Sequence, residues 1–241
     1  MSDYWLGLFM KEWKMMKGIL ITIFILAMLM LLFLDGVTAE GLMDFGLVIT
    51  PFYVIYSLNT ETNQIHLFLH QPNRANKIFL VKILTGLSFT AIFQLVLITI
   101  ILIRLMLQKI DISHGADTMV LYLMYCVLSM LVISLFPTVV LLFAWNTYHW
   151  LKGMVGKLAF LIVVALTILG STSFIYIWDT NWYVKLTHWG ETSFSADKFK
   201  GVLNGLDVYG NFNIGVVLFH GVLVMTLYVM SCWLLDRKVG V

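Results

Sequence analysis

Long apolar runs separated by short polar segments dominate the pattern of this chain. A helix needs about 20 apolar residues to cross the hydrocarbon of a bilayer. Lipid cannot satisfy free backbone groups, and the period-two alternation of a barrel strand is absent. The pattern predicts an all-α integral membrane protein with a single transmembrane domain over residues 1–241. We expect six membrane spans, at 18–34, 41–58, 78–103, 119–145, 158–178 and 214–235.

The composition agrees with burial in lipid. The 241 residues are 61% hydrophobic and 12% charged, with a mean hydropathy of +0.93. Soluble domains are about 45–50% apolar and about 25% charged, so one aqueous core cannot bury this much apolar surface. Both cysteines, Cys126 and Cys232, lie inside apolar runs, which argues against a disulfide framework or a zinc site.

The distribution of charge predicts the orientation, because loops rich in Lys and Arg stay in the cytoplasm. Most of the 15 Lys and Arg residues lie at the termini or in the loops at 59–77 and 146–157, whereas most acidic residues lie in the other loops. We therefore expect a multi-pass protein of the cell membrane. Both termini and both of these loops would be cytoplasmic.

The first 17 residues predict an interfacial helix, 1–17, before the first span. On a helix its large apolar side chains share one face and its Lys residues the other: Trp5, Leu6, Phe9, Trp13 and Met16 against Lys11 and Lys14. We expect the Trp side chains in the headgroup zone and the Lys side chains toward anionic lipid. The alternative is an unstructured basic tail that only sets orientation.

The longest external segment, 179–213, is rich in aromatic residues. Trp182, Trp189 and Phe199 are candidates for resting on the outer leaflet, where aromatic side chains concentrate. The alternative is a small cap that packs on itself.

Signatures of catalysis are missing from the sequence. It has no phosphate-binding loop, nucleophile elbow or zinc-helix motif. His66 and His70 share a helical face but lack a third ligand nearby. We predict no catalytic residue and no metal site.

Polar residues inside the spans are expected to have modest roles. Lys82 can extend its ammonium group to the cytoplasm. No deeply buried charge pair is therefore expected, which argues against an ion-coupled carrier. We expect Gln94 and His220 to bond neighbouring helices rather than to line a path.

The polar break after the second run carries the most specific pattern. Glu61 precedes the apolar patch of Ile65 and Leu67–Leu69, and Pro72 ends it, because a proline disfavours helix in the residue before it. A short cytoplasmic helix is predicted, with an apolar edge suited to docking in a partner's groove.

This order of residues resembles the cytoplasmic signature of ABC-2 type transporter permeases. In that family a Glu is followed by a Leu-rich stretch, a Pro shortly before a basic residue, and then a Lys; here these are Glu61, 67–69, Pro72, Arg74 and Lys82. The Gly that often follows the family's Glu is absent. Small size and the lack of a fused ATPase are similar to Gram-positive half-permeases for peptides or antibiotics, such as phenol-soluble modulin exporters.

The resemblance implies a permease subunit that moves hydrophobic or amphipathic substrates, such as peptides, antibiotics or lipids, out of the cell. Residues 61–71 would form the coupling helix for a separate ATPase subunit, present in two copies. That partner would hold ATP and Mg, so this chain would need no cofactor and would not be an enzyme. Other partners would be membrane lipid and a second permease protomer in a homo- or heterodimer, but no nucleic acid. The residues implied to bind the ATPase are Glu61, Ile65, His66, Leu67, Phe68, Leu69, His70, Pro72 and Arg74.

Two other functions stay open. A membrane sensor or immunity protein would sequester peptides without transport and would survive loss of ATP hydrolysis. A lipid-modifying enzyme would need acids, bases or metal ligands converging at one membrane face, and His114 and His188 show no such spacing.

Overall fold

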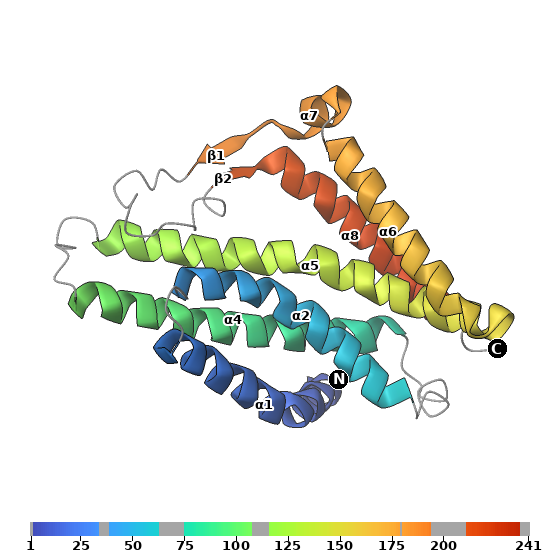
Figure 1. Ribbon diagram of the computed structural model, residues 1–241, viewed down its shortest axis with the longest axis horizontal. Coiled ribbons are helices and arrows are strands. Elements are labelled where there is room, and N and C mark those ends of the chain that lie inside the picture. The colour runs from blue at the N-terminus through green and yellow to red at the C-terminus, as the bar shows by residue number, and fades with distance from the viewer. Residues whose placement is uncertain are drawn as a thin grey trace. The chain divides into compact units, whose positions relative to one another are not determined.

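The computed structural model describes residues 2–33, 39–62, 75–107, 116–178, 180–193 and 211–236. These form helices with one short pair of strands (Figure 1). The prediction of a helical protein is confirmed. The elements are α1 (Ser2–Phe33), α2 (Ala39–Thr62), α4 (Ala75–Leu107), α5 (Ala116–Val155), α6 (Leu158–Trp178), α7 (Asn181–Thr187), β1 (Glu191–Ser193), β2 (Asn211–Asn213) and α8 (Ile214–Leu234).

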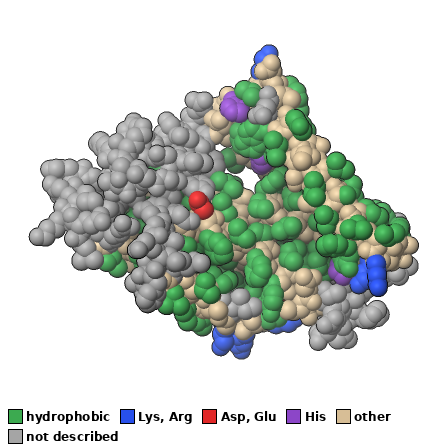
Figure 2. Space-filling view, viewed as in Figure 1, with side chains coloured by type: hydrophobic (Ala, Val, Ile, Leu, Met, Phe, Trp, Pro, Cys, Tyr) green, Lys and Arg blue, Asp and Glu red, His purple; other side chains and the backbone are tan. Residues whose placement is uncertain are grey.

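Five helical segments in the described part of the chain are long and apolar enough to cross a membrane. They match the second to sixth predicted spans. The first predicted span, 18–34, is not among them; it falls in the second half of α1 and partly outside the described residues, so it stays a prediction. Hydrophobic side chains are spread over the described surface on the face drawn in Figure 2.

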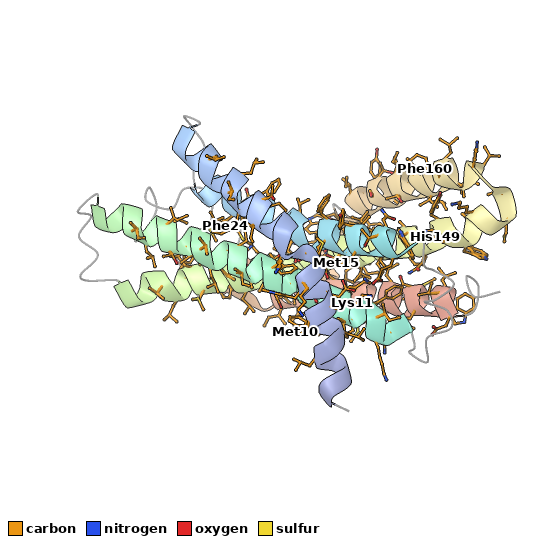
Figure 3. The ribbon with its side chains drawn as sticks, turned by 90° about the horizontal axis from the view of Figure 1, so that it is seen from below. Met10, Lys11, Met15, Phe24, His149 and Phe160 are labelled. Atoms are coloured by element: carbon orange, nitrogen blue, oxygen red, sulfur yellow. The ribbon has the colours of Figure 1, made fainter. Side chains whose placement is uncertain are left out.

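The N-terminal region differs from the prediction of a separate interfacial helix. Residues 1–17 and 18–34 were expected as two elements, but α1 is one helix from Ser2 to Phe33. No proline interrupts it, and the glycine at the expected junction, Gly18, costs only about 1 kcal/mol in a helix. The axis of α1 changes direction near Met15, so Met10 and Phe24 lie on differently oriented stretches (Figure 3).

The predicted cytoplasmic loop at 146–157 is also wrong in its extent. Helix α5 continues through this region to Val155, so only a tight turn at Gly156 and Lys157 joins it to α6. Gly156 ends the helix in a left-handed conformation, φ 61°, which glycine adopts without strain. At 40 residues, α5 is about 60 Å long, well beyond the about 30 Å of bilayer hydrocarbon.

The chain divides into two compact units, and each is described by itself. The first unit holds α1, α2 up to Ser57, α4 from Leu80 and α5 up to Leu135. The second holds the remaining ends of α2, α4 and α5 together with α6, α7, α8 and most of the strand pair. The candidate functional site lies in the first unit.

Candidate functional site

The interface between α2 and α4 is lined by small and polar residues in an antiparallel register. Ser57 of α2 meets Lys82 of α4 through a hydrogen bond that the Lys82 ammonium donates. One turn away, Gly86 lets α2 approach so closely that a Cβ there would lie 3.0 Å from both Thr50 Cγ2 and Tyr53 Cδ1. Glycine at this position therefore allows the two helices to touch, as small residues do between membrane helices.

The same register continues along both helices. The hydroxyls of Thr50 and Thr90 lie 2.8 Å apart and share a hydrogen bond. Beyond them Gly46 makes room for Gln94, whose Nε2 would lie 2.8 Å from a Cβ at Gly46. Gln94 Nε2 also donates to Met130 Sδ of α5 at 3.0 Å. The predicted role of Gln94 in bonding a neighbouring helix is thereby confirmed.

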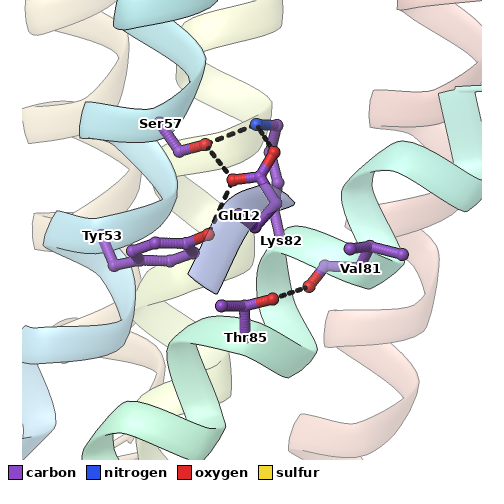
Figure 4. Close-up of polar contacts among 6 residues, drawn as sticks. All are labelled: Glu12, Tyr53, Ser57, Val81, Lys82 and Thr85. Atoms are coloured by element: carbon purple, nitrogen blue, oxygen red, sulfur yellow. Dashed lines mark hydrogen bonds and ion pairs between the residues drawn. The ribbon is translucent and has the colours of Figure 1, made fainter. Parts of the chain in front are cut away.

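Helix α1 joins this interface through the carboxylate of Glu12 (Figure 4). Glu12 Oε2 accepts hydrogen bonds of 2.7 Å from Tyr53 Oη and of 2.7 Å from Ser57 Oγ. Glu12 Oε1 forms an ion pair with Lys82 Nζ at 2.7 Å. We refer to Glu12, Tyr53, Ser57 and Lys82 as the Glu12 cluster; it ties three helices together at one point.

Burial makes the Glu12 cluster energetically important. Glu12 is 4% exposed and Lys82 is 0% exposed. The ammonium of Lys82 therefore does not extend to the cytoplasm, and the expectation that the chain has no buried charge pair is wrong. Removing one partner of such a pair leaves an uncompensated buried charge, which costs about 3–5 kcal/mol. The argument against an ion-coupled carrier loses its premise with this correction.

The ionisation of Glu12 follows from its surroundings. Burial alone would raise the pKa of its carboxyl, because desolvation disfavours the charged form. The positive charge of Lys82 opposes this effect, as do hydrogen bonds from Lys82, Ser57 and Tyr53. Together they hold the pKa of Glu12 below its ordinary value of 4.5. Glu12 is thus ionised at neutral pH, and the ion pair is present.

Aromatic packing holds the same face of α1 against the protein. Trp13 lies with its ring centroid 4.5 Å from that of Phe89 in α4, and Phe9 stacks on Trp13 at 6.0 Å. Met16, one turn beyond Glu12, is 2% exposed. Of this face, which was expected in the lipid headgroups, Trp13 packs on α4 and Met16 is buried, whereas Leu6 is 63% exposed. Lys11 and Lys14 on the other face are exposed, as predicted, and Trp5 lies in the first turns of α1.

The arrangement of the Glu12 cluster is structural rather than catalytic. Its only carboxylate is fully engaged by three donors, and its hydroxyls point at that carboxylate instead of at open space. Within the described ranges, no group of three or more His, Cys, Asp or Glu side chains is arranged to hold a metal ion. The arrangement can fix the relative positions of α1, α2 and α4.

Most residues of the predicted coupling segment lie outside the described residues. Glu61 is the exception; it lies at the end of α2 and is 8% exposed. Its predicted contact with an ATPase stays a prediction. The others outside the described part are Ile65, His66, Leu67, Phe68, Leu69, His70, Pro72 and Arg74.

The external segment shows both an exposed and a packed side. Trp182 and Trp189 are 53% and 50% exposed, whereas Phe199 lies outside the described residues. Between them Tyr183 is buried, with its ring centroid 5.5 Å from Trp178 and 5.3 Å from Phe219. Part of this segment is therefore a cap on α6 and α8, and its two Trp side chains remain available to lipid.

His220 has a different role from the one expected. Its Nδ1 lies 2.8 Å from the carbonyl oxygen of Val216 in its own helix. Its ring contacts Phe136 of α5 at 5.5 Å and Phe174 of α6 at 5.6 Å between centroids. The expected hydrogen bond to a neighbouring helix is not found among the described residues, where aromatic contacts make the link between helices instead.

The Glu12 cluster escaped the sequence reasoning, although two signals were present. Glu12 is the one acid among Lys11, Lys14 and Lys17, and Lys82 is a charge inside an apolar run. Considered alone, each of these charges fits an ordinary structural role that needs no buried partner. Their pairing joins positions 70 residues apart, which no local pattern reveals.

Comparisons with known proteins do not assign the chain to a family. No protein-family model matches the chain, and searches of curated proteins and of solved structures return no match. The resemblance to ABC-2 permeases therefore rests on the residues of the chain alone.

Proposed function

We propose that this chain is the membrane subunit of an ATP-driven exporter of the ABC-2 type. It would move hydrophobic or amphipathic substrates out of the cell and would couple through residues 61–71 to a separate ATPase subunit. Two observations support a role in a membrane: five helices of spanning length and many large hydrophobic side chains that are exposed on the described helices.

The observation that carries the proposal is the bonding between the two helices that flank the predicted coupling segment. Helix α2 leads into this segment and α4 leads out of it. The Lys82–Ser57 hydrogen bond and the Glu12 carboxylate hold the two helices together shortly before and after it. While the Glu12 cluster is closed, a push on the segment would then move α1, α2 and α4 together, which is the property that mechanical coupling needs.

In this proposal the cytoplasmic ATPase would supply the energy. A non-transporting sensor that sequesters peptides is the main competitor. It would use the same apolar helices but would need no tight contact with an ATPase.

Isolation of the chain from its native membrane in mild detergent tests the proposal. Mass spectrometry and an ATPase assay of the eluate should find a near-stoichiometric ATP-hydrolysing subunit. We expect Phe68→Asp to release that subunit and the matched control Phe68→Leu to retain it, because only the first places a charge in an apolar groove. Recovery of the chain without any such partner would contradict the proposal.

A further inference from the structure

The Glu12 cluster joins two kinds of contact that depend on each other. Ser57 and Lys82 bond across the α2–α4 interface, and both also bond the Glu12 carboxylate of α1. Glu12 can satisfy both partners only while they stay within reach of one carboxylate. The docking of α1 is therefore sensitive to the spacing between α2 and α4.

The interface that sets this spacing is unusually close. Gly86 lies one turn beyond Lys82, and a side chain there would press on Thr50 and Tyr53 at 3.0 Å. Tyr53 is itself a member of the cluster and donates to Glu12. Any separation of α2 from α4 at Gly86 thus displaces donors on both sides of the carboxylate.

The ring contacts of α1 are apolar, and they can shift without leaving a buried charge unpaired. Trp13 against Phe89 and Phe24 against Phe93 are ring contacts with centroids 4.5 and 6.4 Å apart. Such contacts lose area gradually, whereas a buried carboxylate that loses its cation becomes strongly unfavourable at once. The Glu12 cluster, unlike these ring contacts, is therefore expected to behave in an all-or-none way.

We propose that the Glu12 cluster is a conformational latch: α1 is docked while α2 and α4 are close and is released when they separate. The N-terminal helix would then report the state of the α2–α4 pair to the membrane surface or to a partner. This inference concerns the docking of α1 and does not require the ATPase, so the labelling of α1 and the recovery of an ATPase subunit are separate tests that can fail independently.

The latch can be tested in membranes that contain the full chain, with Cys126 and Cys232 replaced by Ala. A Met16→Cys reporter is buried against the protein while α1 is docked, since Met16 is 2% exposed. Its reaction with N-ethylmaleimide should be slow. Leu6→Cys, at a position 63% exposed, should react fast in every variant. Ala159→Cys, at a position 0% exposed in α6, should stay protected and shows that the protein remains folded.

A wedge at Gly86 tests whether spacing controls docking. Gly86→Leu should speed the labelling of Met16→Cys by about tenfold or more, since about 1.4 kcal/mol of lost docking is tenfold in the equilibrium. Gly170→Leu is the matched control, because no described atom lies within 4 Å of a Cβ at Gly170. It should leave the rate unchanged. If Gly86→Leu also exposes Ala159→Cys, the smaller wedge Gly86→Ala replaces it.

Charge variants test whether the cluster holds α1. Glu12→Gln should speed labelling as the wedge does, and so should Glu12→Lys or Lys82→Glu alone. The double variant Glu12→Lys with Lys82→Glu should slow it again relative to either single variant. Equal protection of Met16→Cys with and without the wedge, or with and without Glu12→Gln, would overturn the latch.

Discussion

Helices α4 and α6 have the same mean hydropathy, 2.4 over their candidate spans, but 44% of the span in α4 is buried and only 11% of that in α6. The difference arises from partners for small and polar residues. In α4, Gly86 and Thr90 meet α2 directly. In α6, Gly170 has open space beside it and Thr172 bonds its own backbone. Hydropathy thus decides that a helix leaves water, and matched small and polar residues decide which neighbour it joins.

Removal of the buried cation of Lys82 should destabilise the packing of α4 more than changes at Gly86 or Thr90. Lys82→Ala leaves Glu12 charged and buried, so the free energy of unfolding should fall by about 3–5 kcal/mol. The control Lys17→Ala removes an exposed Lys of α1 and should change it by no more than about 0.5 kcal/mol. Denaturant titration of both variants in mixed micelles gives the two values. Equal losses would show that Lys82 is not buried with a partner.

A side chain at the close approach should have the next largest effect. Gly86→Leu overfills the α2–α4 interface and should cost about 1–3 kcal/mol of unfolding free energy. Gly170→Leu, on the open face of α6, should cost less or even stabilise, since Leu is the better helix former. Thermal unfolding of the pair in one detergent measures the difference. A larger loss of unfolding free energy from Gly170→Leu than from Gly86→Leu would contradict a close helix contact at Gly86.

A single hydrogen bond should count for less. Thr90→Val removes the bond to Thr50 at nearly constant volume and should cost about 0.5–1.5 kcal/mol. Thr172→Val removes only a bond to the backbone of α6 and should be nearly neutral. The same unfolding titration distinguishes them, and a neutral Thr90→Val would mean that Thr50 and Thr90 do not depend on each other.

Acid should remove the stabilisation that comes from the ionised Glu12 carboxylate. The pKa of Glu12 is lowered in the folded protein, below 4.5. The stabilisation from its ionised form is therefore fully present above about pH 4.5 and is lost as the pH falls through the lower, folded value. Unfolding midpoints of the wild type and Glu12→Gln should converge only under acid conditions. Convergence between pH 6 and 8 would mean that Glu12 has a raised pKa.

The sequence alone was enough to predict where the helices lie, but it was not enough to predict which helices pack against one another. Apolar runs located all five candidate spans, because length and hydropathy are local properties. The helix ends were misplaced at α5, since residues 146–155 are compatible with either a loop or a helix, and only the left-handed turn at Gly156 ends it.

The errors on charge and aromatic residues have a shared physical origin. The apolar face of α1 fits lipid headgroups and a protein groove equally well, and contact with Phe89 decides between them. Lys82 can either extend to water or pair inside the protein. Its partner, Glu12, lies on another helix, so only the tertiary arrangement settles which occurs.

A double-mutant cycle on Glu12 and Lys82 tests the central claim, that these two side chains bind α1 to the α2–α4 pair. Unfolding free energies are needed for the wild type, Glu12→Ala, Lys82→Ala and the double variant. We predict that the double variant loses about 1–3 kcal/mol less than the sum of the two single losses, because each single variant orphans the other charge. Losses that add to within about 0.5 kcal/mol would show that the two residues act independently and would contradict the account.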